Sequence, residues 1–265
     1  MVKWSIIYEK ALRDDGSLFF PERLSKETLD GHKRAMGSYL FANQYQNIII
    51  PLDQQNFKRE WIRYYSVLPE NLFTFIFVDP AISQQDSADY TGVAVVSVDS
   101  SGMWYVRKAS RHRFTPTELL NYLFTLYQEY KPLGVGIEDV AFQKSLIYFL
   151  SEEMGRRGIY MPIKGVKPTP AKTKEMRILG LVPRFEFGRV LVGPGCEDLL
   201  KEMAVFPRGS HDDVLDALAY IEQLASQPGA KGELDEELPP NHPRYESWYI
   251  KQLAKRASRG DGGFD

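Results

Sequence analysis

The sequence predicts an α/β protein in which three antiparallel strands are followed by parallel strands that alternate with helices. The apolar, β-branched run Phe73–Asp79 predicts a buried strand that stops before Pro80. Two more strand-like runs, Thr91–Val98 and Met103–Arg107, surround the turn residues Asp99–Gly102 and predict a hairpin. Downstream, strand and helix patterns alternate, which is typical of a parallel sheet.

Local signals place the later elements. Thr115-Pro-Thr-Glu118 combines an N-cap, a first-turn proline and a capping-box glutamate ahead of leucines at helical spacing. The other predicted elements are a strand at 133–137, a helix at about 143–156, a strand at 160–163, a basic helix at 173–179, a short strand near Val190 and a helix from Asp213 onward.

The chain divides into three expected parts. Residues 1–65 are mixed, with a turn at Asp14-Asp15-Gly16 and a helical stretch from Ser25 to Tyr39. Residues 66–226 hold the strand and helix pattern. Residues 227–265 are polar and proline-rich, with an acidic run at 233–237 and a basic one at 251–259, and predict a flexible or partner-dependent tail. Two small domains instead of one main domain remain an alternative.

Composition excludes several classes of protein. A chain of 265 residues with 43% hydrophobic and 26% charged residues is typical of a globular protein, and no signal segment or membrane-spanning stretch occurs in it. The single cysteine, Cys196, cannot form an intramolecular disulfide, which favours a reducing, cytosolic setting. The net charge of −2 does not indicate nucleic acid, so any such inference depends on local clusters.

Acidic residues occur at three points where elements begin or end. Asp79 ends the first strand, Glu138 ends the fourth, and His211-Asp212-Asp213 opens a late helix. Because functional groups gather beyond the strand ends of an open α/β sheet, these acids can converge. Clustered carboxylates repel one another unless cations neutralise them, and oxygen ligands favour Mg²⁺ or Mn²⁺. Two such ions support phosphodiester hydrolysis.

Helical geometry ranks the acids of the late helix. Its apolar face is expected to hold Val214, Leu218, Ile221 and Ala225. Asp213 lies at the boundary of this face and is the first choice as a metal ligand, with Asp212 second, whereas Asp216 lies opposite and is expected to be solvated. Taken singly, each acid also has a structural interpretation as a helix cap, a turn residue or a loop residue. Their joint placement favours a metal site.

Two basic clusters are candidates for contacts with DNA phosphates. The first holds Arg107, Lys108, Arg111 and Arg113, and the second holds Lys164, Lys167, Lys172, Lys174 and Arg177. An exposed, solvated face is the alternative for any single lysine.

An ordered set of motifs resembles the large terminase subunits of tailed phages. The set consists of Phe77-Val-Asp79-Pro-Ala81, Ser87-Ala-Asp89-Tyr-Thr91-Gly, Gly136-Ile-Glu138 and Gly209-Ser-His211-Asp-Asp213-Val-Leu-Asp216-Ala, and the resemblance spans about residues 18–225. It implies a ribonuclease H-like fold with a central mixed five-stranded sheet, three antiparallel then parallel strands, flanked by helices. Residues 1–65 resemble the family's junction between motor and nuclease.

The resemblance also assigns roles to residues. Asp79, Glu138 and Asp213 match the family's catalytic metal-binding acids, with Asp212 as a further ligand for two Mg²⁺ or Mn²⁺ ions. Asp89 would shape its loop or touch the second metal, or be a turn or strand cap. His211 would orient a carboxylate, or be an ordinary histidine beside a helix. Asp216 is a further candidate to support the ligands.

The resemblance implies a metal-dependent endonuclease that cuts concatemeric viral DNA during packaging into procapsids. Its expected partners are double-stranded DNA, the terminase motor, the portal protein and the small terminase subunit, with no membrane, in the host cytoplasm rather than the mature virion. No G-x-x-x-x-G-K-[ST] occurs in these 265 residues, so ATP hydrolysis is not expected and a fragment or a split-gene product is implied. The alternatives are another ribonuclease H-like nuclease, of junction-resolvase or transposase type, and a catalytically silent DNA-binding or assembly module.

Overall fold

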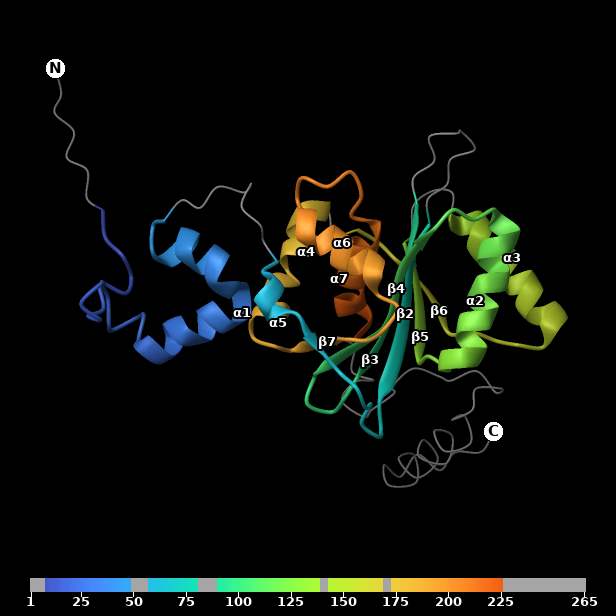
Figure 1. The fold of residues 1–265 in the computed structure, drawn as a ribbon, viewed down its shortest axis with the longest axis horizontal. Helices are drawn as coiled ribbons and strands as arrows, with labels where there is room; N and C mark the ends of the chain where they lie inside the picture. Colours follow the sequence, from blue (N-terminus) through green and yellow to red (C-terminus); the bar gives the residue numbers. More distant parts are fainter. Residues whose placement is uncertain (1–7, 49–56, 81–89, 139–142, 169–172, 226–265) are drawn as a thin grey trace, which may run out of the picture.

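The computed structural model of this chain describes residues 8–48, 57–80, 90–138, 143–168 and 173–225. They form a sheet with helices on both faces, α2 and α3 on one side and α4, α5, α6 and α7 on the other, with α1 beyond α5 (Figure 1). The strands are β1 (Arg63–Tyr64), β2 (Phe73–Asp79), β3 (Thr91–Val98), β4 (Trp104–His112), β5 (Gly134–Glu138), β6 (Ile163–Val166) and β7 (Val190–Val192). The helices are α1 (Lys26–Tyr45), η1 (Arg59–Trp61), α2 (Pro116–Tyr130), α3 (Gln143–Arg157), α4 (Lys174–Leu179), α5 (Val182–Glu186), α6 (Glu197–Val205) and α7 (Asp213–Ala225).

The sheet is mixed and its strand order is β1-β7-β4-β3-β2-β5-β6. The predicted antiparallel trio is confirmed, because β3 pairs antiparallel with both β2 and β4, and the later pairs β2–β5 and β5–β6 are parallel. The expected number of strands is corrected from five to seven. The short strand β7 joins β4 in parallel, and the two-residue β1 joins β7. Both are too short to carry a clear alternating pattern.

Both faces of the sheet are covered, which explains the continuous apolar runs of its central strands. Along β2, Phe75 and Phe77 pack into the core beneath α7, whereas Ile76 and Val78 pack into the core beneath α2 and α3. All eight residues of β3 are buried. The central strands are therefore fixed from both sides, so the ends of these strands are held in place.

Helix starts follow the sequence signals closely. The capping box of Thr115 and Glu118 is present at the start of α2, and Ser25 and Thr173 cap α1 and α4. Other boundaries differ from those predicted. Strand β4 continues to His112 and so includes most of the first basic cluster, and β6 begins at Ile163, where a strand at 160–163 was expected to end.

The segment before residue 66 contributes to the core under α7. Phe57 is 1% exposed and lies against Phe185 and Phe206, and β1 extends the sheet. The expected tail at 227–265 lies outside the described residues. Within the described ranges, no helix combines the length and the apolar character that crossing a membrane requires.

Candidate active site

Two acids lie side by side where adjacent parallel strands end. Strands β2 and β5 pair in register through Val78 and Ile137, so the next residues, Asp79 and Glu138, meet at one edge of the sheet. Their carboxyl groups share a hydrogen bond. The sequence placed both acids at strand ends, and the pairing of β2 with β5 brings them together.

A glycine brings the third acid to this edge. Gly92 of β3 pairs with Asp79, and a Cβ on Gly92 would lie 2.1 Å from the backbone oxygen of Asp213. The start of α7 therefore approaches the β3 backbone more closely than any side chain permits. This approach places Asp213 at the same sheet edge as Asp79.

A buried glutamate caps α7 from another helix. Glu202 of α6 is 3% exposed, and its Oε2 accepts hydrogen bonds from the backbone N–H groups of Val214 at 3.0 Å and Leu215 at 2.9 Å. Unpaired N–H groups at a helix start attract a carboxylate. Burial, opposed by these hydrogen bonds and increased by the charge of Asp213, raises the pKa of Glu202 to about 7.

A lysine ammonium lies among the acids of α7. The Nζ atom of Lys174 is 2.8 Å from Asp212 Oδ1, 3.6 Å from Asp213 Oδ1 and 3.9 Å from Asp216 Oδ2. Burial lowers and these carboxylates, together with Asp79, raise the pKa of Lys174, with a net rise. Lys174 is thus a cation held by the same acids that were expected to hold metal.

Asp216 is buried, not solvated as the helical projection predicted. Its side chain is 3% exposed and accepts two hydrogen bonds from Arg177, at 2.6 and 2.8 Å. The projection failed because α7 is enclosed by the sheet, α4 and α6 and is buried nearly all round. A buried carboxylate needs such a partner, and Arg177 supplies it.

The environment favours the protonated forms of two of the acids. Burial, followed by the charges of Glu138 and Asp216, raises the pKa of Asp79 to about 8. Burial also raises the pKa of Asp213, against the lowering effect of Lys174. Clustered, desolvated carboxylates with raised pKa values are typical of sites that bind cations or transfer protons.

Glu138 is held by a tyrosine from α7. The hydroxyl of Tyr220 donates a hydrogen bond to Glu138 Oε1, and the Tyr220 ring stacks on Phe77 with centroids 4.4 Å apart. Arg177 lies 4.1 Å over the other face of that ring. The orientation of Glu138 is therefore fixed by a side chain packed in the core.

The acids leave binding capacity unused. Asp213 Oδ2 is buried without a hydrogen-bond partner in the described part of the chain, and His211 Nδ1 lies 3.7 Å away, beyond hydrogen-bonding distance. The described residues do not bring three His, Cys, Asp or Glu side chains into one ready metal-binding group. Instead, Asp79 with Glu138 forms one group and the acids around Lys174 form another. Oxygen donors of this kind fit Mg²⁺ or Mn²⁺.

The first basic cluster divides along β4. Cross-strand pairing runs from Asp79 through Gly92 to Arg111, so Arg111 lies at the acidic edge. Arg111 and Arg113 lie 4.8 and 4.6 Å from the centre of the Tyr90 ring, which also contacts His211 edge to face. Arg107 and Lys108 lie three to four residues back along the strand, roughly 10 Å from this edge.

The second basic cluster is also divided. Exposed Lys167 follows β6, beside the end of β5, whereas exposed Lys164 pairs with Gly136 further from the edge. Lys174 and Arg177 contact the acids. Two of the predicted site residues, Asp89 and Lys172, lie outside the described residues.

A family model described as a terminase RNaseH-like domain matches residues 76–223, more than half of the chain, including Asp79, Glu138 and Asp213. The chain belongs to this family. The terminase RNaseH-like domain therefore extends from the middle of β2 into α7.

Solved structures agree with the family assignment. The large terminase of a thermophilic bacteriophage is 15% identical over 76% of this chain and 51% of its own, with a TM-score of 0.56, and its complex with ADP gives 14%, 77%, 53% and 0.56. The large terminase nuclease domain of Thermus phage P74-26 is 20% identical over 61% of this chain and 89% of its own, with a TM-score of 0.43. The first two structures support the ribonuclease H-like fold. This chain spans about half the length of the large terminase that they contain, and a comparison with curated proteins finds no match.

Three groups that organise the terminase site were not predicted. Tyr220 and Glu202 occupy ordinary buried positions of amphipathic helices, and only the fold shows that they contact Glu138 and the α7 backbone. Gly92 carried a signal, since a glycine inside a strand run often marks a close backbone approach.

Proposed function

We propose that this chain is a metal-dependent DNA endonuclease that cuts concatemeric viral DNA during genome packaging into procapsids. The observation that carries this proposal is the convergence of Asp79, Glu138 and Asp213 at one edge of a sheet with the terminase nuclease fold. The raised pKa values of Asp79 and Asp213, and the unpartnered Asp213 Oδ2, support a site that takes up cations.

Asp79, Glu138 and Asp213 would hold the metal, with Asp212 as a further ligand. When bound, two Mg²⁺ or Mn²⁺ ions lower the pKa of an attacking water and neutralise charge at the scissile phosphate. Asp79 must lose its proton to bind a cation, because its pKa of about 8 leaves it largely protonated at neutral pH. The Tyr220 hydroxyl holds Glu138 in position during this change.

The chain's cations would hold the DNA on both sides of the acids. Arg111 and Arg113 lie at the β4 end of the edge, and Lys167 follows β6 on the other side. Contacts of Arg and Lys with phosphates position a duplex without reading its sequence. Lys174 and Arg177 face carboxylates and would balance their charge where DNA enters.

The partners follow from membership of the terminase family. We expect the terminase motor, the portal protein and the small terminase subunit to act with this chain on double-stranded DNA in the host cytoplasm. The motor is expected as a separate chain or domain, since these 265 residues hold no phosphate-cradling glycine-rich motif.

Cleavage of supercoiled plasmid tests the proposal. Wild type with Mn²⁺ or Mg²⁺ should nick or linearise the plasmid, and EDTA, Asp79→Ala or Asp213→Ala should abolish cleavage. Asp30→Ala, which removes an exposed acid of α1, is the matched control and should cleave like wild type. Cleavage that survives both active-site substitutions would overturn the proposed site. A strong preference for four-way junctions over linear duplex would favour the resolvase alternative.

A further inference from the structure

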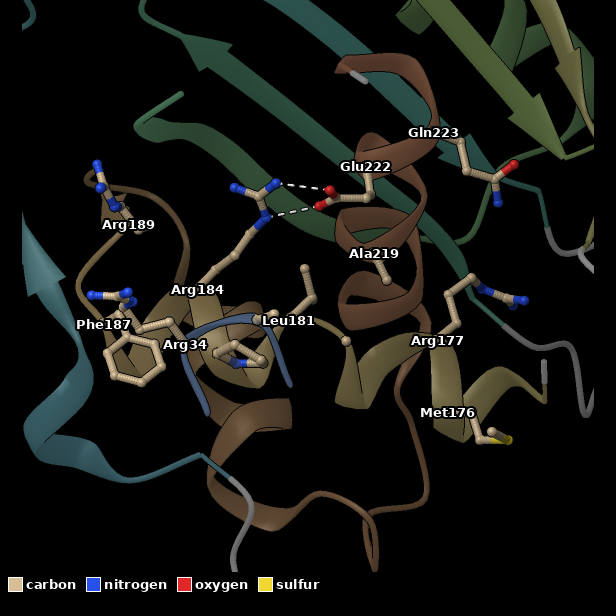
Figure 2. A pocket seen from close by; sticks show the side chains of 13 residues that line it. Arg34, Met176, Arg177, Leu181, Arg184, Phe187, Arg189, Ala219, Glu222 and Gln223 are labelled. Atoms are coloured by element: carbon tan, nitrogen blue, oxygen red, sulfur yellow. Dashed lines mark hydrogen bonds and ion pairs between the residues drawn. The ribbon is translucent and has the colours of Figure 1, made fainter. Parts of the chain in front are cut away.

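An arginine-lined pocket lies beside the acidic edge. It has a volume of about 780 Å³ and is enclosed by residues of α1, α4, α5 and α7 and the turn after α5, with Arg34, Arg177, Arg184 and Arg189 in its lining. In Figure 2, Arg34, Arg189 and Phe187 lie on one side of the pocket and Met176 and Arg177 on the other. A pocket of this size can hold a ligand as large as a nucleotide.

The pocket carries an excess of positive charge. Arg184 pairs with Glu222 through two hydrogen bonds of 2.7 and 2.8 Å, and Arg177 is neutralised by Asp216. Arg34 and Arg189 are exposed, and neither forms an ion pair within the described residues. Two positive charges therefore remain unbalanced in the pocket of a chain whose net charge is −2. Such a concentration of charge indicates an anionic ligand.

Arg34 reaches the pocket because α1 is kinked and anchored. Gly37 adopts a φ of 79° inside α1, and a Cβ there would meet Pro183 Cγ of α5 at 3.1 Å. The next residue, Ser38, donates hydrogen bonds from its backbone N–H and its hydroxyl to Glu186 at the end of α5. The kink thus packs α1 against α5 and sets Arg34 at the rim of the pocket.

Helix α4 connects the pocket to the acids. Lys174 in its first turn contacts Asp212 and Asp213, and Met176 and Arg177 in the same helix line the pocket. At 1.5 Å of rise per residue, Lys174 and Arg177 are separated by roughly 5 Å along the helix axis. A polymer bound at the acids would therefore pass directly into the pocket.

We propose that this pocket binds a phosphate-linked segment of the DNA strand that leaves the acidic site, with Arg34 and Arg189 contacting its phosphates. The inference rests on the proposed nuclease function and adds a binding surface to it. Arginine forks match phosphate oxygens in pairs. Phe187, 37% exposed, and Met176, 54% exposed, offer apolar surface against which an unpaired base can stack.

An acidic protein segment would use the same charges but has no planar groups for Phe187 and Met176. A free nucleoside phosphate or inorganic phosphate offers the same phosphate chemistry as DNA, without a chain that continues to the acids. The test therefore compares these ligands directly.

The experiment measures binding without cleavage. The full chain in EDTA is titrated into labelled single-stranded and duplex oligonucleotides, and fluorescence anisotropy is followed from low to high salt. The variant Arg34→Ala/Arg189→Ala is compared with Arg23→Ala/Arg59→Ala, which removes two exposed arginines outside the pocket. The pocket variant should bind at least about tenfold more weakly at low salt and lose about 1.4–1.8 from the slope of log K against log salt, as expected for two lost phosphate contacts.

Each outcome decides the inference. Equal binding by the pocket variant and the control would overturn it, and so would inorganic phosphate or ADP competing at the affinity of the oligonucleotide, or an acidic peptide binding more tightly than DNA in an arginine-dependent way. Plasmid cleavage is scored separately. Cleavage with unchanged DNA binding by the pocket variant removes the pocket and leaves the nuclease, whereas arginine-dependent DNA binding without any cleavage removes the nuclease and leaves the pocket.

Discussion

Asp79 combines burial with a second carboxylate in hydrogen-bonding contact. Each of these raises its pKa, and together they raise it to about 8. In the unfolded chain the same carboxyl titrates near 3.8. Between these two values the folded protein holds a proton that the unfolded chain has released, so folding and proton binding are coupled at Asp79.

The sign of this coupling gives the first prediction. In EDTA, thermal stability should fall as the pH rises from about 4 to about 8, because the folded state binds more protons than the unfolded state over this range. Asp79→Asn should show a shallower fall. Added Mn²⁺ should raise the melting temperature of the wild type more at pH 8 than at pH 6, since protons compete with the cation. Parallel pH profiles for wild type and Asp79→Asn would show that Asp79 titrates normally.

Gly92 is the second residue-scale test. A methyl group there would lie 2.1 Å from the Asp213 backbone oxygen, so Gly92→Ala must push the start of α7 away from β3. We expect a loss of about 1–3 kcal/mol in the free energy of unfolding and loss of plasmid cleavage. Gly31→Ala, at an α1 position with no atom within 4 Å of the added Cβ, is the control. Wild-type cleavage by Gly92→Ala would contradict the close approach.

Sequence reasoning at this scale found the acids because strand ends and helix starts leave local signals. Asp79, Glu138 and Asp213 were each marked by such a boundary. Asp216 was misplaced because a helical projection assumes one buried face, whereas α7 is packed on several sides. Tyr220 and Glu202 act through contacts with distant elements, which a single sequence does not encode locally.

Helix α7 is the element on which the site depends, since its first turn carries Asp213 and its third carries Tyr220. Its N-terminus is stabilised by Glu202, and no residue next to it in sequence provides that cap. The position of the catalytic turn is thus coupled to the packing of α6 against α7.

Removing this cap should destabilise the protein and weaken cleavage. Glu202→Ala leaves two buried N–H groups without an acceptor, at about 1–3 kcal/mol each. Glu202→Gln keeps one acceptor oxygen and should lose less. Urea unfolding measures stability, and plasmid cleavage at a temperature where both variants are folded measures the site. Equal stability of Glu202→Ala and wild type would show that water caps α7 as well as Glu202 does.

Element types were more predictable than element edges. The helix starts at Ser25 and Thr115 agree with the structure, because capping side chains act within three residues of themselves. Strand β6 was shifted, because its register is set by pairing with β5. That pairing is a long-range contact between residues that lie far apart in sequence.

The whole molecule joins the segment before residue 66 to the sheet. Phe57 packs between Phe185 and Phe206, and β1 adds the outermost strand beside β7. A division of the chain at residues 65 and 66 was expected from composition, and it would separate these contacts. The two-residue strand β1 has no periodicity from which it could be predicted.

The contribution of this segment is measurable. Phe57→Ala should lower the free energy of unfolding by about 3–5 kcal/mol, as a large aromatic loses its place in the core. Val67→Ala removes a side chain that is 79% exposed and should change stability little. A chain that begins at residue 66 should unfold at a lower temperature than one that begins at residue 57. Equal melting temperatures would make residues 57–65 dispensable for the fold.

Titration with Mn²⁺ tests the central claim, that Asp79, Glu138 and Asp213 form one divalent-metal site. Calorimetry at pH 8 should show Mn²⁺ binding to the wild type and to Asp30→Asn, and strongly weakened binding to Asp79→Asn, Glu138→Gln and Asp213→Asn, each confirmed as folded. Binding that is the same in all five proteins, or absent from the wild type, would contradict the account.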